Sequence, residues 1–328
     1  MGKDCIVEIP KNRWDHSLYF DKEKGKTGKT YSKWVGFIDD VDKFDPLFFN
    51  ITPVNAEIMD PQERLFLECV YETFEDAGYV YGNMGYTSSS ELSRNVGVFV
   101  GLMYEEYQLF GGETILERSA ALSNSPASVA NRASHFFDLT GPSMTINTMC
   151  SSSLISVHMA YQSIRRKECN LAIAGGVNVS VHPNKYLILA QARFLSSKGK
   201  CESFGVGGDG YVPSEGVGAV LLKPLKDAID DGDHIYGVIK GSAINHDGRT
   251  NGYTVPNPGA QGNVVSQALK DARINPNRIS YIEAHGTGTI LGDPIEITGL
   301  TKAFREYTQE NQFQTSVFLH FFYIFFWT

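Results

Sequence analysis

Short apolar runs alternate with stretches of helical spacing along most of this chain. We expect buried strands over residues 95–101, 171–177 and 216–222, and further strands over 235–243 and 280–284. Strands that are apolar on both faces, when they alternate with helices, are typical of parallel or mixed sheets covered by helices on both sides. The pattern therefore predicts an α/β fold built on mixed β-sheets.

The clearest helix signal covers residues 59–74, where apolar positions recur at helical spacing. Asp60 is a suitable N-cap, Pro61 suits the first turn, and Gly78 is a natural stop. Weaker patterns predict three more helices, over 125–137, 260–272 and 293–304.

Residues 141–154 combine a strand, a sharp turn and the start of a helix. Met144 and Ile146 suit a buried strand, and the hydroxyls of Ser151–Ser153 can accept hydrogen bonds from the free N–H groups of a helix N-terminus. Cys150 lies at the turn, where the helix dipole favours a thiolate, the form in which cysteine acts as a nucleophile. The alternative that this segment leaves open is a small cysteine of the core.

His285 marks a second candidate site, in the glycine-rich segment 282–296 between a predicted strand and a predicted helix. Loops at the ends of parallel strands are where such folds place active sites. Alone, His285 could be a structural histidine. Together with Cys150 it indicates a catalytic pair.

Composition narrows the function classes. The formal net charge of −8 argues against nucleic-acid binding. Five cysteines without a Cys-x-x-Cys spacing indicate neither a disulfide framework nor a metal site. The N-terminus has no apolar signal region, and the aromatic run 317–327 is shorter than the roughly 20 residues that span a bilayer. We therefore expect a cytoplasmic protein that binds no membrane.

Several motifs, in order, resemble the β-ketoacyl synthase (ketosynthase) domain of modular polyketide synthases, in the thiolase-like superfamily. Thr148-Met-Cys150-Ser-Ser-Ser is similar to the nucleophile motif, and Glu283-Ala-His285-Gly-Thr287-Gly-Thr289 to the first histidine motif. Further similar segments are 59–64, 207–213, 215–218 and 291–296. The sequences of residues 182–185 and 251–257 resemble those of ketosynthases from polyketide synthases whose acyltransferase is supplied separately.

The resemblance implies a thiolase-like fold of two related halves, with helices covering mixed sheets. By motif order, residues 1–225 form the N-terminal half without its first strand, 226–312 an incomplete C-terminal half, and 313–328 an unrelated aromatic tail. Ketosynthases of this kind are expected to be homodimers.

The resemblance also implies a reaction. Cys150 takes an acyl chain from the phosphopantetheine thioester of an acyl carrier protein. A malonyl-type thioester then loses carbon dioxide and attacks that acyl group, while His285 hydrogen-bonds the malonyl carbonyl. Thr287 and Thr289 line the pantetheine channel. No metal and no tightly bound cofactor is implied.

Departures from the family leave other interpretations open. The Lys-Ser-Asn-Ile-Gly-His segment with the second catalytic histidine is missing, and His320 lacks its flanking residues. Asn147 stands where the family commonly has aspartate. We expect condensation to be impaired. The alternatives are a fragment that accepts acyl groups without condensing them, and a non-catalytic pseudogene product or subunit that binds carrier proteins.

Overall fold

The computed structural model describes residues 3–79, 94–111 and 125–307. They divide into two compact units, the first made of Met1–Arg193 with Val212–His234 and the second of Phe194–Tyr211 with Ile235–Thr328. The predicted aromatic tail 313–328, with His320, lies outside the described residues.

A four-stranded mixed sheet forms the centre of the first unit, in the order β4-β3-β5-β6. Its strands are β3 (Val96–Gly101), β4 (Ser143–Ile146), β5 (Leu171–Asn178) and β6 (Gly216–Leu222). β4 and β5 run parallel to β3, and β6 runs antiparallel to β5. These four strands lie where the sequence predicts them.

The inner and outer strands differ in burial. Every residue of β3 is buried, whereas β4 and β6 are only partly covered. The expectation that β4 and β6 are buried strands is therefore wrong. The physical reason is that each of them pairs with a single neighbour in the described sheet.

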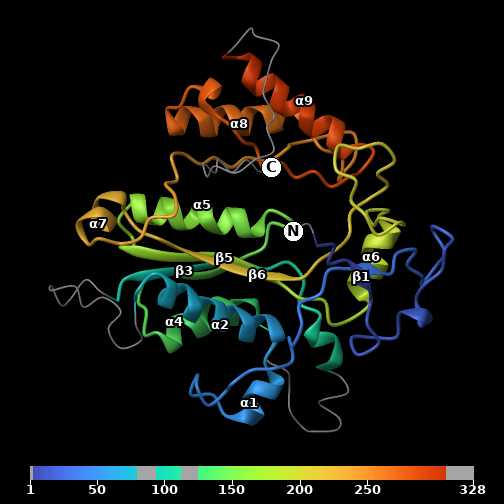
Figure 1. Ribbon diagram of the computed structural model, residues 1–328, viewed down its shortest axis with the longest axis horizontal. Helices are drawn as coiled ribbons and strands as arrows, with labels where there is room; N and C mark the ends of the chain where they lie inside the picture. Colours follow the sequence, from blue (N-terminus) through green and yellow to red (C-terminus); the bar gives the residue numbers. More distant parts are fainter. Residues whose placement is uncertain (1–2, 80–93, 112–124, 308–328) are drawn as a thin grey trace. The chain divides into compact units, whose positions relative to one another are not determined.

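Helices cover both faces of this sheet (Figure 1). α5 (Ser152–Arg165) lies on one face, and α2 (Pro61–Asp76) and α4 (Pro126–Phe136) lie on the other. Among the described residues of this unit, the other helical elements are α1 (Pro53–Ile58), η1 (His16–Leu18), η2 (Tyr107–Phe110), α6 (Asn184–Gln191) and α7 (Leu225–Asp230). β1 (Val7–Glu8) and β2 (Trp34–Val35) form a separate antiparallel pair.

Alternation along the strands divides the core into two layers. Val98 and Ile173 face α2 and α4, where they join a cluster that includes Phe66. Phe99 and Ala174 belong to a smaller cluster with Ala160 of α5. The apolar runs of β3 and β5 are thus buried on both faces, as their sequences indicate.

The start of α2 follows its sequence signals. The Asp60 carboxylate accepts a hydrogen bond from the Gln62 N–H at 2.8 Å, and Pro61 occupies the first turn. Gly78 follows the end of the helix with a φ of 79°. All three assignments are confirmed.

Two helices dominate the second unit. α8 (Pro258–Ala272) packs on α9 (Gly292–Arg305) around Val265, Leu269 and Phe304, and η3 (Pro276–Arg278) follows α8. The expected strands 235–243 and 280–284 are wrong in the part of this unit that the structure describes, where neither segment is assigned to a strand. A strand needs a hydrogen-bonded neighbour, which apolar sequence alone does not provide.

The packing of α2 generates a stability prediction. Leu67 is 1% exposed and Leu47 is 71% exposed, so Leu67→Ala removes buried contacts whereas Leu47→Ala does not. We expect Leu67→Ala to lower the free energy of unfolding by about 2–5 kcal/mol. Leu47→Ala should stay within about 0.5 kcal/mol. Urea denaturation followed by circular dichroism measures both, and equal effects would contradict the assigned core.

Candidate active site

The turn between β4 and α5 is a tight elbow with Cys150 beside its most unusual residue. Met149 has a φ of 61°, in the left-handed region that residues other than glycine rarely adopt. Its N–H donates to Asn147 Oδ1 at 3.0 Å. Such conformations persist only where the surroundings enforce them, and they concentrate at functional sites.

Serine hydroxyls hold the elbow together. Ser152 Oγ accepts from the Thr148 N–H at 2.9 Å and donates to the Met149 carbonyl at 2.6 Å. Ser151 Oγ donates to the Thr148 carbonyl at 2.8 Å, and no side chain caps the helix from this N-cap position. The expectation that the hydroxyls of Ser151 and Ser152 cap α5 is therefore wrong: they bond back into the turn, because the turn's own backbone groups lie closer.

The first turn of α5 lies directly against the sheet. A methyl group at Gly101, the last residue of β3, would overlap the backbone nitrogen of Ser153. Ser156 Oγ donates to the Gly175 carbonyl of β5 at 2.7 Å and fixes the helix one turn later. Only a residue without a Cβ allows backbones to approach this closely, so Gly101 determines where the elbow sits.

Cys150 is an exposed residue at this elbow. The protein around its sulfur removes enough water to raise the pKa of the thiol, and the positive charge of Lys185 acts in the opposite direction. The helix N-terminus favours the thiolate, whereas desolvation acts in the opposite direction and raises the pKa of the thiol overall.

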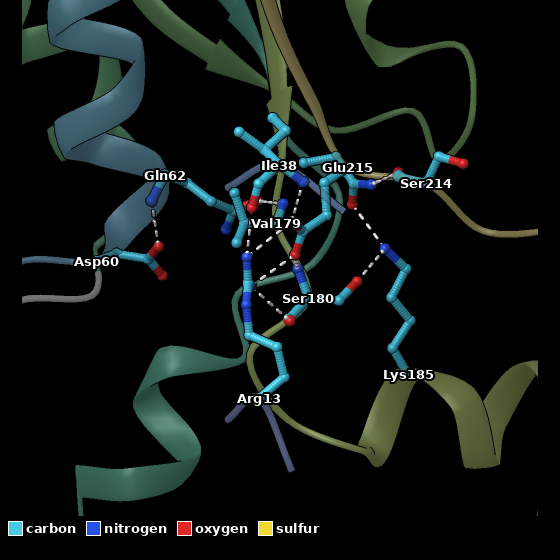
Figure 2. Close-up of polar contacts among 10 residues, drawn as sticks. Arg13, Ile38, Asp60, Gln62, Val179, Ser180, Lys185, Ser214 and Glu215 are labelled. Carbon is cyan, nitrogen blue, oxygen red and sulfur yellow. Dashed lines mark hydrogen bonds and ion pairs between the residues drawn. The ribbon is translucent and has the colours of Figure 1, made fainter. Parts of the chain in front are cut away.

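A buried network of charges lies in the same unit (Figure 2). The Glu215 side chain is fully buried and forms a bidentate ion pair with Arg13. The Nη1–Oε1 distance is 2.9 Å and the Nη2–Oε2 distance is 3.1 Å. It also accepts the N–H groups of Ser180, at 2.8 Å, and Ile38, at 3.0 Å. With four donors on two oxygens, this carboxylate joins segments that are far apart in sequence.

Gln62 makes a second long-range link, from the first turn of α2. Its Oε1 accepts the Val179 N–H at 3.0 Å, directly after β5, and its Nε2 donates to the Tyr104 carbonyl at 2.7 Å. The sequence predicts 59–64 as a helix start and a family motif, and the contacts of Gln62 add a long-range structural role.

Lys185, in α6, is a charged residue whose side chain is buried in the first unit. It is 4% exposed, and its Nζ donates to Asn178 Oδ1 at 2.7 Å and to Ser180 Oγ at 3.0 Å. The Tyr104 ring centroid lies 5.0 Å from the same atom. Burial lowers the pKa of Lys185, whereas the nearby Glu106 carboxylate raises it. Sequence reasoning missed Lys185, although the segment 182–185 is a family motif.

The His285 loop belongs to the second unit and is held by two carboxylates of α9. Glu296 accepts the N–H groups of His285, at 2.6 Å, and Gly286, at 2.9 Å. Asp293 accepts the Gly288 N–H at 3.0 Å. Gly288 has a φ of 70°, and a methyl group there would overlap the Cys201 carbonyl. Glycine at this position is therefore a requirement of the loop.

The three predicted residues of this loop lie within five positions of one another. Thr287 Oγ1 and Thr289 Oγ1 are 3.0 Å apart, and Thr289 Oγ1 accepts the N–H of Gly292 at the start of α9. His285 is an exposed residue, yet protein around its ring lowers its pKa to about 4, with Asp293 acting in the opposite direction. The imidazole is therefore neutral near pH 7.

Over the described ranges, no group of three His, Cys, Asp or Glu side chains is placed to hold a metal ion. Over the same ranges, no helix is both long and apolar enough to cross a membrane.

Comparison with known proteins identifies the class. Residues 1–228 match the description "Beta-ketoacyl synthase, N-terminal domain", and residues 236–317 match "Beta-ketoacyl synthase, C-terminal domain". The chain belongs to the beta-ketoacyl synthase family.

Among its relatives are parts of large polyketide synthases. The chain is 64% identical over 313 residues to polyketide synthase PksL of Bacillus subtilis, a match to 95% of this chain and 7% of that protein. It is 61% identical over 306 residues to polyketide synthase ThaG of Burkholderia thailandensis, covering 93% of this chain and 5% of that protein. The chain thus spans a small part of the length of these relatives.

Solved structures agree with the fold. The oxazolomycin ketosynthase domain OzmH KS7 of Streptomyces albus is 51% identical with a TM-score of 0.89, over 94% of this chain and 52% of that one. The ketosynthase from module 6 of the bacillaene synthase of Bacillus subtilis is 42% identical with a TM-score of 0.84, over 94% and 50%. The predicted thiolase-like α/β fold is confirmed.

The contact between Gly101 and α5 generates a second prediction. Gly101→Ala forces β3 and α5 apart, so we expect a loss of about 1–3 kcal/mol in the free energy of unfolding and altered alkylation of Cys150. Gly218→Ala is the matched control, because a methyl group at this strand glycine meets nothing within 4 Å. Urea denaturation and iodoacetamide labelling measure the two effects. Equal stability of both variants would contradict the close approach.

The lowered pKa of His285 generates a third prediction. In the urea-unfolded chain, His285 should titrate near the ordinary histidine value of about 6.5, whereas in the folded chain it should stay neutral until the pH approaches about 4. NMR of the chain with ¹³C-labelled histidine follows the titration, and His285→Gln assigns the signal. A folded-state midpoint near that of the unfolded chain would contradict the prediction.

Proposed function

We propose that this chain acts as a ketosynthase of a polyketide synthase, elongating an acyl chain by decarboxylative condensation. The observation that carries the proposal is the Cys150 elbow, in which the left-handed Met149 holds a cysteine between a parallel strand and a helix. A ketosynthase needs a nucleophile held in this way, because the acyl chain is attached to it between two reactions.

In the first half-reaction, Cys150 sulfur attacks the acyl thioester carbonyl of an acyl carrier protein. A bond forms between sulfur and the acyl carbon, and the phosphopantetheine thiol of the carrier leaves with a proton. The Cys150 N–H, at the start of the α5 turn, is a candidate donor to the oxyanion of the tetrahedral intermediate. Phosphopantetheine arrives on the carrier protein, so the chain itself needs no tightly bound cofactor.

In the second half-reaction, a malonyl-type thioester loses carbon dioxide, and the electron pair of the broken bond forms an enolate. The enolate carbon attacks the acyl-Cys150 carbonyl, and the Cys150 thiolate leaves. His285 is proposed to donate a hydrogen bond to the malonyl thioester oxygen. A neutral imidazole suits this role, since it keeps its N–H at neutral pH. Thr287 and Thr289 are proposed to line the pantetheine channel.

The finer assignments rest on the family resemblance. The motifs 182–185 and 251–257 support a synthase whose acyltransferase is supplied separately. We also propose an N-terminal half up to residue 225 and a C-terminal half after it, a homodimer, and a cytoplasmic location, to which five free cysteines are suited.

Carrier-protein assays test the function. We expect incubation with acyl and malonyl carrier proteins to acylate Cys150 and then to give, at an impaired rate, a chain longer by two carbons, detected by mass spectrometry. Cys150→Ala should abolish both steps. Cys5→Ala is the matched control, because Cys5 is also exposed. Acylation without elongation would contradict condensation, and carrier binding without acylation of Cys150 would contradict both steps.

A further inference from the structure

We propose that Lys185 is a positioning residue for this reaction, whose buried ammonium group favours the thiolate of Cys150. The inference rests on the proposed role of Cys150 as the nucleophile and names the group that controls its ionisation. Lys185 lies outside the nucleophile and histidine motifs, so those motifs give it no role.

Strand topology brings the two residues to the same edge of the sheet. β3, β4 and β5 are parallel, so their carboxyl ends lie side by side. β4 leads to Cys150, β3 leads to Tyr104, and β5 ends at Asn178, which holds the Lys185 ammonium.

Side-chain contacts link these segments further. The Asn147 side chain reaches from the elbow to the Met103 carbonyl at 3.5 Å. The neighbouring residue, Tyr104, has its ring 5.0 Å from Lys185 Nζ. The elbow and the ammonium group are thus joined through one segment, residues 103–104, at the end of the central strand.

The ammonium group is fixed in place without losing its charge to a bonded carboxylate. The ammonium group contacts Asn178 Oδ1, Ser180 Oγ and the Tyr104 ring, which are all uncharged. Glu106 accepts the backbone N–H of Lys185 at 2.7 Å rather than the ammonium group. A buried charge that is held by neutral dipoles acts over a longer distance than one in water, because the medium around it screens it less.

The other charged groups support this assignment. Glu106, Glu215 and Cys150 all raise the pKa of Lys185 against the effect of burial. Of these, Glu215 is already paired with Arg13. In return, Lys185 lowers the pKa of Cys150 against the effect of burial. Tyr104 faces the same groups, and burial and Cys150 raise its pKa, so it stays neutral.

Alkylation across a pH range tests the proposal without any carrier protein. The rate at which iodoacetamide alkylates Cys150 is measured from pH 6 to pH 10. The thiolate is the form that reacts, so the rate follows its population. Peptide mass spectrometry separates Cys150 from the four other cysteines. Because the pKa of Lys185 is about 8, its charge acts on Cys150 below that pH. There we expect the reaction in Lys185→Met to be about tenfold slower than in the wild type, the equivalent of about one pH unit.

Lys185→Gln separates charge from hydrogen bonding, because its amide can still donate to Asn178 and Ser180. We expect Lys185→Gln to change the pH profile of Cys150 alkylation in the same way as Lys185→Met. The glutamine variant therefore still tests the proposal if the methionine variant folds poorly. Lys223→Met is the matched control. Lys223 follows β6, which runs antiparallel to β5 and therefore ends at the opposite edge, and its Nζ bonds Asp233 at 2.6 Å. This variant should keep the wild-type profile.

Two results would overturn the inference: a wild-type profile in Lys185→Gln, or an equal shift in Lys223→Met. Because the assay reads the thiol alone, its failure is distinct from a failure of condensation, which only the carrier-protein assay measures.

Discussion

The constraint on which the first unit depends is the close approach of α5 to the parallel strands. Gly101 leaves no room for a side chain between β3 and Ser153, so the helix begins directly over the strand ends. That placement forces the chain from β4 to reverse within a few residues, which gives Met149 its left-handed conformation. The hydroxyls of Ser151 and Ser152 then satisfy the polar groups of the turn. The exposure of Cys150 therefore follows from the packing of a helix on a sheet.

The same packing removes water from the Cys150 thiol, and this desolvation disfavours the thiolate. A dipole at a helix N-terminus contributes modestly, whereas desolvation can move a pKa by several units. In this elbow desolvation has the larger effect, and it raises the pKa of Cys150. A nearby positive charge is the physical means of opposing it, and Lys185 is the charge that does so. Holding that charge requires its own support, which Asn178 and Ser180 provide.

Local sequence predicts what local interactions determine. Asp60, Pro61 and Gly78 marked the ends of α2 correctly because caps and stops depend on neighbouring residues. The strands of the first sheet and the elbow were found for the same reason. The roles of Gln62 and Glu215 were not found, because their partners lie 117 and 202 residues away. Lys185 was missed although the partners of its ammonium group lie 7 and 5 residues away, because a lysine in the sequence does not show that its side chain is buried. The strands predicted over 235–243 and 280–284 were wrong, because an apolar sequence does not by itself provide a neighbouring strand to pair with.

In the second unit, carboxylates rather than helix–sheet packing fix the conformation of the His285 loop. Glu296 and Asp293 bond backbone N–H groups of the His285 loop, so their negative charges are satisfied by the loop they shape. Asp293 favours the protonated ring of His285, but desolvation has the larger effect and keeps the ring neutral. A neutral ring can donate a hydrogen bond to a developing enolate, but it cannot transfer a second proton to quench that enolate before it attacks. In the proposed reaction, the lowered pKa of His285 would thus favour carbon–carbon bond formation over simple decarboxylation.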